Sequence, residues 1–443
     1  MDLSSLSCKR RWRRAVKLIC AMLVAVAAGV ASAEPKDASR LHLLWPPHQN
    51  WEVQLLSKTQ KAFLAKPRAE RTKDFADAGK RAILRIDANA PTPTILSWEW
   101  TPEEGETAPQ FTVEVRRDDG LPVAAKDVRE THVTVDNLEI GRSYSWTVYA
   151  KAGGRILASA MGGFRTDPTP PRLIRVDGVR NVRDLGGRVG LGGRRIRQGL
   201  VFRSAGLNTN PPAIAFLTPE MARAEFDAGT LTNRTCWQAG HMAKIFRGEW
   251  DANDWHLVPT ATAGRGAQVL TEAGRATMLE TLGVRTDLDL RGADEVVGMK
   301  GSPLGDCVKW VNVHMTAYEG LATEEGKRLV KACFDVFLDT ANYPIDFHCI
   351  AGQDRTGTLA FLLEALLGVD DEELYRDWEC SGFTNPNVWF RHDHLFNRIY
   401  DVINAYPGAS TRERTEAYLR ECGLTDADFA FLRKLLLEEG AAR

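Results

Sequence analysis

The sequence lacks a strong excess of charge of either sign and, past residue 33, any apolar stretch long enough to cross a membrane. It has 57 basic and 58 acidic residues among 443, a formal charge of −1. Residues 1–33 carry six of the basic residues and one acidic residue, so the remainder holds 51 and 57, a net charge of about −6. This balance gives no basic surface for nucleic acid, and we expect no nucleic-acid partner.

Cysteine is also scarce, and six cysteines lie beyond residue 33: Cys236, Cys307, Cys333, Cys349, Cys380 and Cys422. If one of them must stay a thiol, an odd number remains, and the sequence assigns no disulfide pairs. His392 and His394 are two residues apart, so on a helix they would not face the same way. We therefore expect no metal and no cofactor.

The first 33 residues are typical of an export signal. A basic run at residues 9–17 precedes an apolar run at residues 18–30, which is shorter than the roughly 20 residues of a membrane span. Ala31-Ser32-Ala33 fits the small-x-small cleavage pattern. We expect cleavage before Glu34 and a periplasmic or secreted protein with no transmembrane span; the alternative is an uncleaved N-terminal anchor.

Residues 34–84 carry no pattern that assigns them a role. Residues 85–167 alternate apolar and polar side chains, for example at 111–117 and 143–149, with turn residues between the runs. This alternation predicts short half-buried strands and a β-sandwich.

The run Asn137-Leu-Glu-Ile-Gly-Arg-Ser-Tyr-Ser-Trp146 resembles the corner of fibronectin type III domains. The resemblance implies a fibronectin III-like sandwich over residues 85–167. It also implies that the Tyr144 hydroxyl bonds to backbone upstream, as a structural group.

The proline-rich segment 167–171 reads as a linker, because its prolines stiffen the chain. Beyond it, strand and helix patterns alternate over residues 172–440, which predicts an α/β domain with a parallel-rich sheet. Residues 207–269 interrupt the pattern, with Trp237, Trp250 and Trp255. We interpret this stretch as an insertion that forms a lid.

The segment His348-Cys-Ile-Ala-Gly-Gln-Asp-Arg-Thr-Gly357 lies between a predicted strand and a predicted apolar helix. Backbone N–H groups in such a turn form an anion nest, and the helix adds positive potential at its N-terminus. Both favour the thiolate of Cys349, which makes it a nucleophile. Arg355 offers a two-pronged donor to phosphoryl oxygens.

The other residues of the segment have supporting roles in this interpretation. Thr356 assists departure of the thiolate in a second step, and His348 supports the loop by hydrogen bonding. The residues expected to bind phosphate are Ile350, Ala351, Gly352, Gln353, Asp354 and Arg355.

The segment resembles the signature loop of protein tyrosine and dual-specificity phosphatases. Asn181-Val-Arg-Asp-Leu-Gly-Gly187, Gly199-Leu-Val-Phe-Arg-Ser204 and Leu282-Gly-Val-Arg-Thr-Asp-Leu-Asp-Leu-Arg291 precede it in order. With them the chain resembles bacterial atypical tyrosine/lipid phosphatases, whose loop commonly reads His-Cys-x-Ala-Gly-Lys-Asp-Arg-Thr-Gly. Gln353 stands at the usual lysine position, which removes a cation and argues against a preference for highly charged inositol lipids.

A general acid is the less defined part of the site, since the sequence has no Trp-Pro-Asp segment. Asp354 is the leading candidate, and its alternative role is to organise the loop. Asp289 is the second candidate, although an ion pair with Arg291 is an equal alternative. We expect Asp184, with Arg183, to hold the start of the domain in place.

The resemblance implies an exported cysteine-dependent phosphatase that acts on a phosphorylated protein, a small phosphoester or a lipid. Phosphotyrosine or dual specificity is the leading expectation. One alternative is a phosphoinositide or inositol-phosphate phosphatase on the same loop. Another is a non-catalytic protein that binds phosphorylated ligands or serves adhesion.

Overall fold

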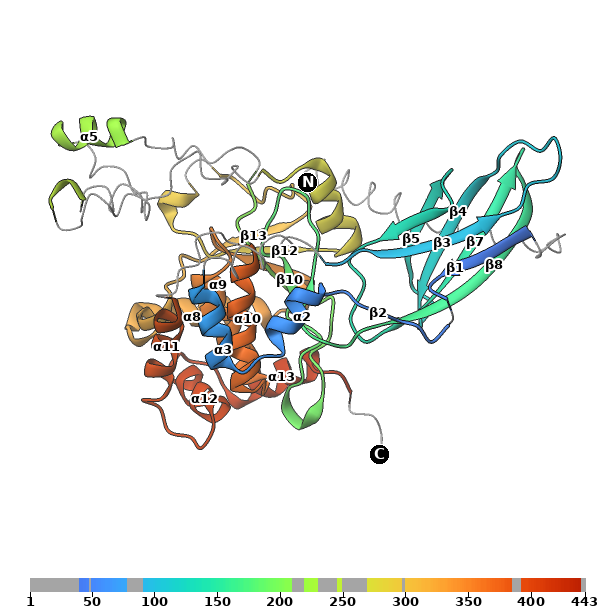
Figure 1. Ribbon diagram of the computed structural model, residues 1–443. Helices are drawn as coiled ribbons and strands as arrows, with labels where there is room; N and C mark the ends of the chain where they lie inside the picture. The colour runs from blue at the N-terminus through green and yellow to red at the C-terminus, as the bar shows by residue number, and fades with distance from the viewer. Residues whose placement is uncertain are drawn as a thin grey trace, which may run out of the picture.

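The computed structural model describes residues 40–47, 49–77, 91–208, 219–229, 245–248, 269–296, 299–384 and 392–439. The expected export signal lies outside the described residues, as do Trp237, Trp250 and Trp255 and most of the expected insertion. Figure 1 shows a group of long strands beside a part of the chain that mixes strands and helices.

Two β-sheets form the first of these parts. Among the described residues, one sheet has antiparallel strands in the order β1 (Leu41–Trp45), β3 (Thr94–Trp100) and β6 (His132–Val135). The other has the order β2 (Glu52–Val53), β8 (Arg155–Thr166), β7 (Ser143–Ala152), β4 (Gln110–Arg117) and β5 (Pro122–Val128). Strands β1 and β2 come from the segment to which the sequence assigned no role.

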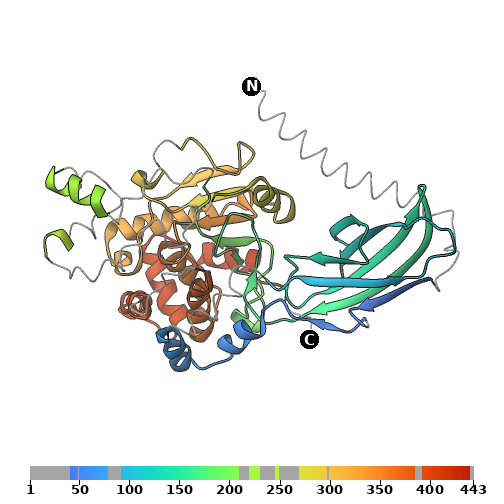
Figure 2. The same cartoon turned by 45° about the horizontal axis from the view of Figure 1, so that its top comes forward.

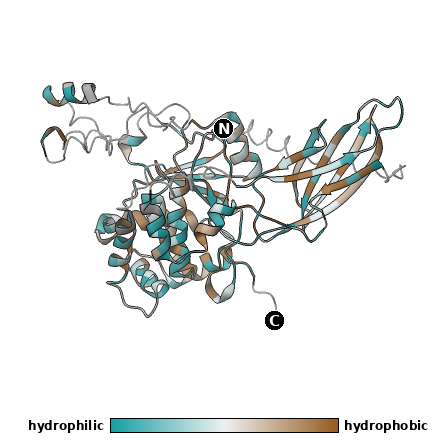
Figure 3. Cartoon of the chain, viewed as in Figure 1, coloured by the Kyte–Doolittle hydropathy of each residue, from teal (hydrophilic) through white to brown (hydrophobic). Residues whose placement is uncertain are grey.

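The two sheets share one hydrophobic core. The ring centroid of Trp98 on β3 lies 5.2 Å from that of Phe111 on β4 and 6.4 Å from that of Trp146 on β7. Apolar and polar residues alternate along the strands in Figure 3, and every second residue of β4 and β7 is buried over most of their length. The predicted alternation is confirmed.

Tyr144 lies where the sequence places it, at the start of the long strand β7. Its hydroxyl accepts a hydrogen bond from the backbone N–H of Glu139 at 2.8 Å. Burial raises the pKa of Tyr144 to about 12. The predicted bond to upstream backbone is confirmed, and the residue is structural.

The α/β part is built on a second kind of sheet. Its strand order is β13 (Lys309–Asn312), β12 (Thr286–Asp289), β14 (Ile345–His348), β11 (Val201–Ser204), β10 (Arg183–Asp184) and β9 (Arg172–Leu173). The first four strands in this order, from β13 to β11, are parallel to one another. Strand β10 is antiparallel to both of its neighbours, β11 and β9. The prediction of a parallel-rich sheet is confirmed.

Helices pack around this sheet (Figure 1). The α-helices that the structure describes in this part are α5 (Pro219–Asp227), α7 (Glu272–Ala276), α8 (Glu324–Phe337), α9 (Asp354–Leu366), α10 (Asp371–Thr384), α11 (His392–Ile403), α12 (Thr411–Glu421) and α13 (Asp426–Leu436). A π-helical turn at Thr277–Thr281 continues α7, and short 3-10 turns lie at Leu191–Gly193, Ala293–Glu295, Tyr318–Ala322 and Thr340–Asn342. Helix α9 is buried on all sides from Thr356 to its end, as an apolar central helix must be.

Two helices from the N-terminal segment, α2 (Lys58–Leu64) and α3 (Arg68–Ala76), pack against α10, and we call them the N-terminal clasp. Figure 2 shows them in blue beside the helices of the α/β part. The fully buried Arg71 donates from Nε to Glu379 Oε2 at 2.5 Å and also pairs with Glu372. The guanidinium of Arg68 lies 3.4 Å from the ring centroid of Tyr375. The segment without an assigned role therefore binds the α/β part.

Candidate active site

Cys349 lies on the turn between β14 and α9, which is where the sequence places it. The strand ends at His348 and the helix begins at Asp354, so residues 349–353 form a short connection, here called the Cys349 loop. Cys349 is 2% exposed. Because Asp354, Arg355 and Thr356 occupy the first helical turn, the structure brings all the leading candidates to one place.

The carbonyl groups of the Cys349 loop are held from outside. The Ile350 carbonyl accepts from the Gly206 N–H at 3.0 Å. Asn181 Nδ2 donates to the carbonyls of both Ala351 and Gly352 at 3.0 Å. A trans peptide directs its N–H opposite to its carbonyl, so the amides that follow these carbonyls turn to the other side. This arrangement supports the expected anion nest.

Gly352 is required by the path of this loop. Its φ is +69°, a left-handed conformation that side chains rarely adopt. A Cβ there would lie 2.3 Å from the Ser204 carbonyl oxygen. The loop therefore packs directly on the end of β11, and a side chain at 352 would push it out of place.

The thiol of Cys349 is more acidic than an ordinary thiol. Burial alone would raise its pKa, but the Arg355 guanidinium and the Thr356 hydroxyl and amide outweigh burial and the nearby Asp354, and the pKa is lowered. Cys380 is equally buried, and burial raises its pKa to about 12 even though Arg183 and Arg188 oppose the shift. The position of Cys349 on the loop, and not its burial, makes its thiol acidic.

Arg355 is held by a carboxylate that the sequence reasoning missed. Its Nη2 donates to Glu295 Oε1 at 3.0 Å, and its Nη1 donates to Glu295 Oε2 and to the Leu290 carbonyl. A guanidinium has five N–H donors. Within the described residues no bond is made from Nε, so the edge formed by Nε and Nη2 is left for an anion.

Asp354 bonds to a tyrosine that was also not predicted. The Tyr318 hydroxyl donates to Asp354 Oδ1. Tyr318 has φ of +55° and is 7% exposed. The signal for it in the sequence is weak, because it lies outside every quoted motif and 36 residues from its partner.

His348 supports the loop from below, as expected. Its Nε2 lies 2.8 Å from Asp287 Oδ1 and its Nδ1 lies 3.2 Å from the Cys349 carbonyl oxygen. Burial opposes its charge, but Asp289 and Asp287 outweigh burial and raise the pKa of His348 to about 9. The imidazolium therefore donates from both nitrogens and does not serve as a base.

Asp289 is held as an ion pair. Arg291 donates to its carboxylate from Nε at 2.8 Å and from Nη2 at 2.7 Å. Although burial opposes it, His348 and Arg291 lower the pKa of Asp289 to about 2. A general acid must hold a proton near neutral pH. The geometry favours the alternative in which Asp289 and Arg291 shape the site.

Asp184 and Arg183 hold the start of the domain, as expected. Asp184 is fully buried, pairs with Arg172 at 2.8 Å and accepts from the N–H groups of Gly186 and Gly199 at 2.7 Å. Burial raises the pKa of Asp184 in spite of these partners. These contacts tie β9 and β10 to the turn that leads into β11.

A buried group of charges lies behind the Cys349 loop, and we call it the Asp377 cluster. Its members are Asp377, Arg183, Arg188 and Arg203. Arg203 also donates from Nη2 to the Gly352 carbonyl at 2.7 Å. The motifs around residues 181–187 and 199–204 thus supply the groups that hold the loop, although the sequence did not reveal this role.

The remaining predicted residues lie in or beside the loop. Gln353 precedes α9 and is 2% exposed, and Thr356 is fully buried. Ile350 is the exposed member, at 38%. Its side chain therefore lies at the outer surface of the loop, and only its backbone belongs to the nest.

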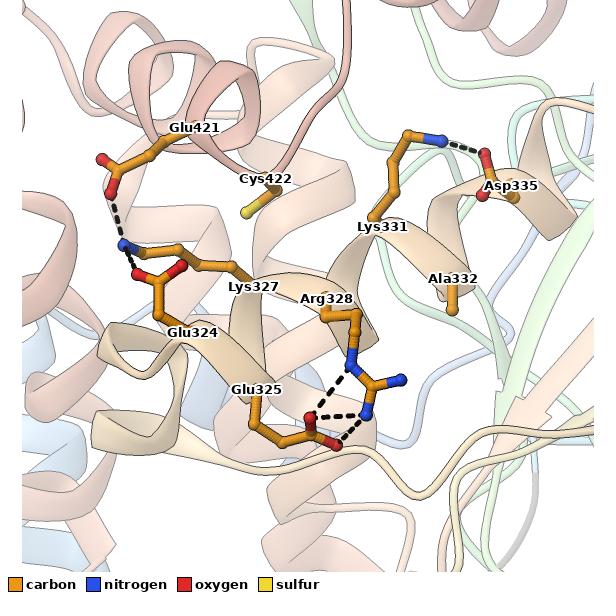
Figure 4. A pocket seen from close by; sticks show the side chains of 9 residues that line it. All are labelled: Glu324, Glu325, Lys327, Arg328, Lys331, Ala332, Asp335, Glu421 and Cys422. Atoms are coloured by element: carbon orange, nitrogen blue, oxygen red, sulfur yellow. Dashed lines mark hydrogen bonds and ion pairs between the residues drawn. The ribbon is translucent and has the colours of Figure 1, made fainter.

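A shallow depression of about 640 Å³ lies on α8 and α12, and no residue of the Cys349 loop lines it (Figure 4). Its cations Lys327, Arg328 and Lys331 all pair with neighbouring carboxylates. Paired surface charges of this kind form a solvated face.

Other features of the described residues bear on the site. Cys307, Cys333, Cys349, Cys380 and Cys422 are all free thiols. No group of three or more metal-ligating side chains is present among the residues that the structure describes. Within these same ranges, no helix is both long and apolar enough to cross a bilayer.

Residues 174–218 and 264–438 match a family model described as the tyrosine phosphatase family. The α/β part of this chain is thus similar to the tyrosine phosphatase family. The matched ranges contain the Cys349 loop, Asn181, Arg203 and Tyr318. The matched ranges thus include both the expected residues and the groups that hold them.

One relative is a protein of Cupriavidus necator named "putative tyrosine-protein phosphatase", which is 28% identical over 220 residues. The match covers 48% of this chain and 64% of that protein, so it spans less than two thirds of the relative's length. The family match places the similarity in the part of the chain that carries the Cys349 loop.

Two solved structures are also similar in part. The core catalytic domain of the PP-IP phosphatase SIW14 from S. cerevisiae is 16% identical, covers 33% of this chain and 76% of that chain, and has a TM-score of 0.21. The twitchin kinase region from C. elegans is 20% identical, covers 28% of this chain and 19% of that chain, and has a TM-score of 0.14. At these scores neither likeness carries an inference about this protein.

Proposed function

We propose that this protein is an exported phosphatase that hydrolyses phosphate monoesters through a phosphocysteine at Cys349. The observation that carries the proposal is the Cys349 loop itself. Its carbonyls are tied outward, its thiol is acidified by Arg355 and Thr356, and one edge of Arg355 remains for an anion. These are the features that phosphoryl transfer to sulfur needs.

In the first step the thiolate of Cys349 attacks phosphorus in line with the leaving oxygen. The bond from phosphorus to that oxygen breaks, and Asp354 gives its proton to the leaving alcohol or phenol. Amides of the loop and the free edge of Arg355 hold the equatorial oxygens as their charge develops. Glu295 keeps the guanidinium in the orientation that presents this edge.

In the second step water attacks the phosphocysteine. Asp354, now a carboxylate, takes a proton from the water, and the bond between sulfur and phosphorus breaks. The Thr356 hydroxyl stabilises the departing thiolate, and inorganic phosphate leaves. The chain needs no cofactor for either step.

Phosphotyrosine or dual specificity is the proposed substrate range. The support is Gln353, which stands buried beside the nest where a lysine would add a cation for polyphosphorylated ligands. Phosphoinositides and inositol phosphates remain the alternative substrates on the same loop. A non-catalytic binding role is disfavoured because Cys349, Arg355 and Thr356 are all present.

Turnover of an aryl phosphate by the full chain tests the function. We expect that Cys349→Ser abolishes turnover and still binds vanadate, because serine keeps the nest but is a far weaker nucleophile. Trapping a phosphorylated cysteine by rapid acid quench of the parent would identify the intermediate. Activity of Cys349→Ser within about tenfold of the parent would exclude the phosphocysteine mechanism.

Export to the periplasm or the medium is a separate part of the proposal. It is supported by the basic run at residues 9–17 followed by the apolar run at 18–30. Cell fractionation and N-terminal sequencing of the exported protein should give a chain that begins at Glu34. A cytoplasmic protein that keeps residues 1–33 would overturn it.

A further inference from the structure

Tyr318 is attached at both ends to the start of α9. Its hydroxyl donates to Asp354 Oδ1, and its backbone N–H donates to Thr358 Oγ1 at 3.2 Å. The Thr358 hydroxyl donates in turn to the Asp354 carbonyl at 2.9 Å. The residue is therefore fixed to the segment that carries the proposed general acid.

The backbone of Tyr318 is strained in a way that serves this contact. A φ of +55° is unfavourable for a bulky side chain and persists only where the surroundings impose it. The turn that follows is tight: a Cβ on Gly320 would lie 1.6 Å from Thr316 Oγ1. Such outliers cluster at functional sites, and here the outlier brings one hydroxyl to Asp354.

The hydroxyl of Tyr318 stays protonated. Burial, and then the negative charge of Asp354, raise the pKa of Tyr318 well above its ordinary value, and Cys349 acts in the same direction. Tyr318 is therefore a hydrogen-bond donor to Asp354 throughout the pH range in which a phosphatase works.

We propose that Tyr318 is a positioning residue that occupies Oδ1 of Asp354 and presents Oδ2 to the leaving oxygen. The inference rests on the proposed function. When the bond between phosphorus and the leaving oxygen breaks, the proton moves from Oδ2 to that oxygen. When water attacks the phosphocysteine, Oδ2 takes a proton from the water. Tyr318 donates to Oδ1 in both steps and exchanges no proton itself.

This role makes a prediction that depends on the substrate. An alcohol or phenol of high pKa leaves poorly as an anion and needs the proton from Asp354. 4-Nitrophenolate leaves readily without it. A residue that orients the acid should therefore matter much more for phenyl phosphate than for 4-nitrophenyl phosphate.

The test is Tyr318→Phe, which removes the hydroxyl and keeps the ring. We expect kcat/KM to fall about tenfold or more for phenyl phosphate and less than threefold for 4-nitrophenyl phosphate. Tyr343→Phe is the matched control, because Tyr343 is also buried and its hydroxyl donates to the Phe337 carbonyl at 2.7 Å. That variant should change the two substrates equally, if at all.

A double-mutant cycle separates positioning from general packing. In an Asp354→Asn background the acid is already gone, so Tyr318→Phe should have no further substrate-specific effect. An equal loss on both substrates, or an undiminished loss in the Asp354→Asn background, would overturn the inference.

Two further results keep the test decisive. If Tyr318→Phe does not fold, 3-fluorotyrosine incorporated at position 318 keeps the ring and strengthens the donor. The ratio of kcat/KM for phenyl phosphate to that for 4-nitrophenyl phosphate should then change, and an unchanged ratio would count against the role. If Tyr318→Phe affects the two substrates equally while Cys349→Ser stays inactive, only this inference is overturned. Turnover by Cys349→Ser would overturn the proposed function.

Discussion

Charged side chains meet the Cys349 loop on two sides, and the two groups differ in their access to water. Arg355 and Glu295 each keep 21% of their side chain exposed. Asp377 and its three arginines keep between 0 and 2%. The first pair leaves an edge of Arg355 for a substrate, whereas the Asp377 cluster holds loop carbonyls and strands.

The difference shows how one kind of interaction serves two purposes. Removing one partner of a fully buried ion pair strongly destabilises the fold, because the other charge is left uncompensated. A partly wetted pair is weaker and rearranges at lower cost. The buried Asp377 cluster therefore fixes the geometry behind the Cys349 loop. The partly exposed pair of Arg355 and Glu295 in front of the loop can rearrange.

The largest expected effect comes from the buried side. Asp377→Asn should lower the free energy of unfolding by about 3–5 kcal/mol, because three buried arginines lose the anion they share and, among the described residues, only Arg188 keeps a second carboxylate, Glu364. Urea unfolding measures it, with Asp335→Asn as the control. Asp335 is half exposed and pairs with Lys331 on α8, so its loss should cost less than about 1 kcal/mol. Similar losses of unfolding free energy in the two variants would contradict the distinction between buried and exposed ion pairs.

Arg355→Lys should act on catalysis and spare stability. We expect catalytic efficiency to fall by more than about a hundredfold, roughly 2.7 kcal/mol in the barrier, since lysine cannot present two parallel donors. Steady-state kinetics and urea unfolding on the same preparation separate the two quantities. A kinetic loss below about tenfold would mean that Arg355 does not hold the transferring phosphoryl group.

Glu295→Gln tests whether the front pair orients Arg355 or blocks it. Because the free edge of Arg355 is presented by the bond to Glu295, kcat/KM should fall about tenfold, near 1.4 kcal/mol. Glu325→Gln, which breaks an exposed pair with Arg328, should leave kcat/KM unchanged. A gain in activity for Glu295→Gln would show that the carboxylate competes with the substrate.

Gln353→Lys is expected to have the smallest effect. A lysine beside the nest should raise kcat/KM for a phosphoinositide relative to 4-nitrophenyl phosphate by about fivefold, and added salt should shrink the gain. Gln353→Met matches the length without the charge and should not change the ratio. An unchanged ratio in Gln353→Lys, or a parent that already prefers phosphoinositides, would show that position 353 does not set the preference.

The sequence predicted what is contiguous and missed what is distant. Cys349, Asp354 and Arg355 lie within one loop and one helical turn, so a motif sufficed to place them together. Glu295 joins Arg355 across 60 residues, and Asp377 joins Arg203 across 174. Such pairs produce no periodic pattern in the amino-acid sequence, because they depend on how strands and helices pack.

Local chemistry also left alternatives that only packing could decide. Asp289 fitted both a general acid and an ion pair with Arg291, and its burial between Arg291 and His348 favours the ion pair. The alternation in β4 and β7 was enough for the sandwich strands. The N-terminal clasp had no comparable signal, since its role depends on α10, some 300 residues later.

Helix α10 connects the clasp to the site, because it carries Glu379, which Arg71 holds, and Asp377 two residues earlier. The linker at residues 167–171 therefore marks a domain boundary in the sequence, but contacts that stabilise the α/β part come from residues on both sides of it. A fragment that begins at Arg172 would leave Glu379 without its buried cation and uncover Phe383, against which Phe63 packs at 5.6 Å between ring centroids. Proteolytic release of the phosphatase domain would disturb the helix that anchors its own Asp377 cluster.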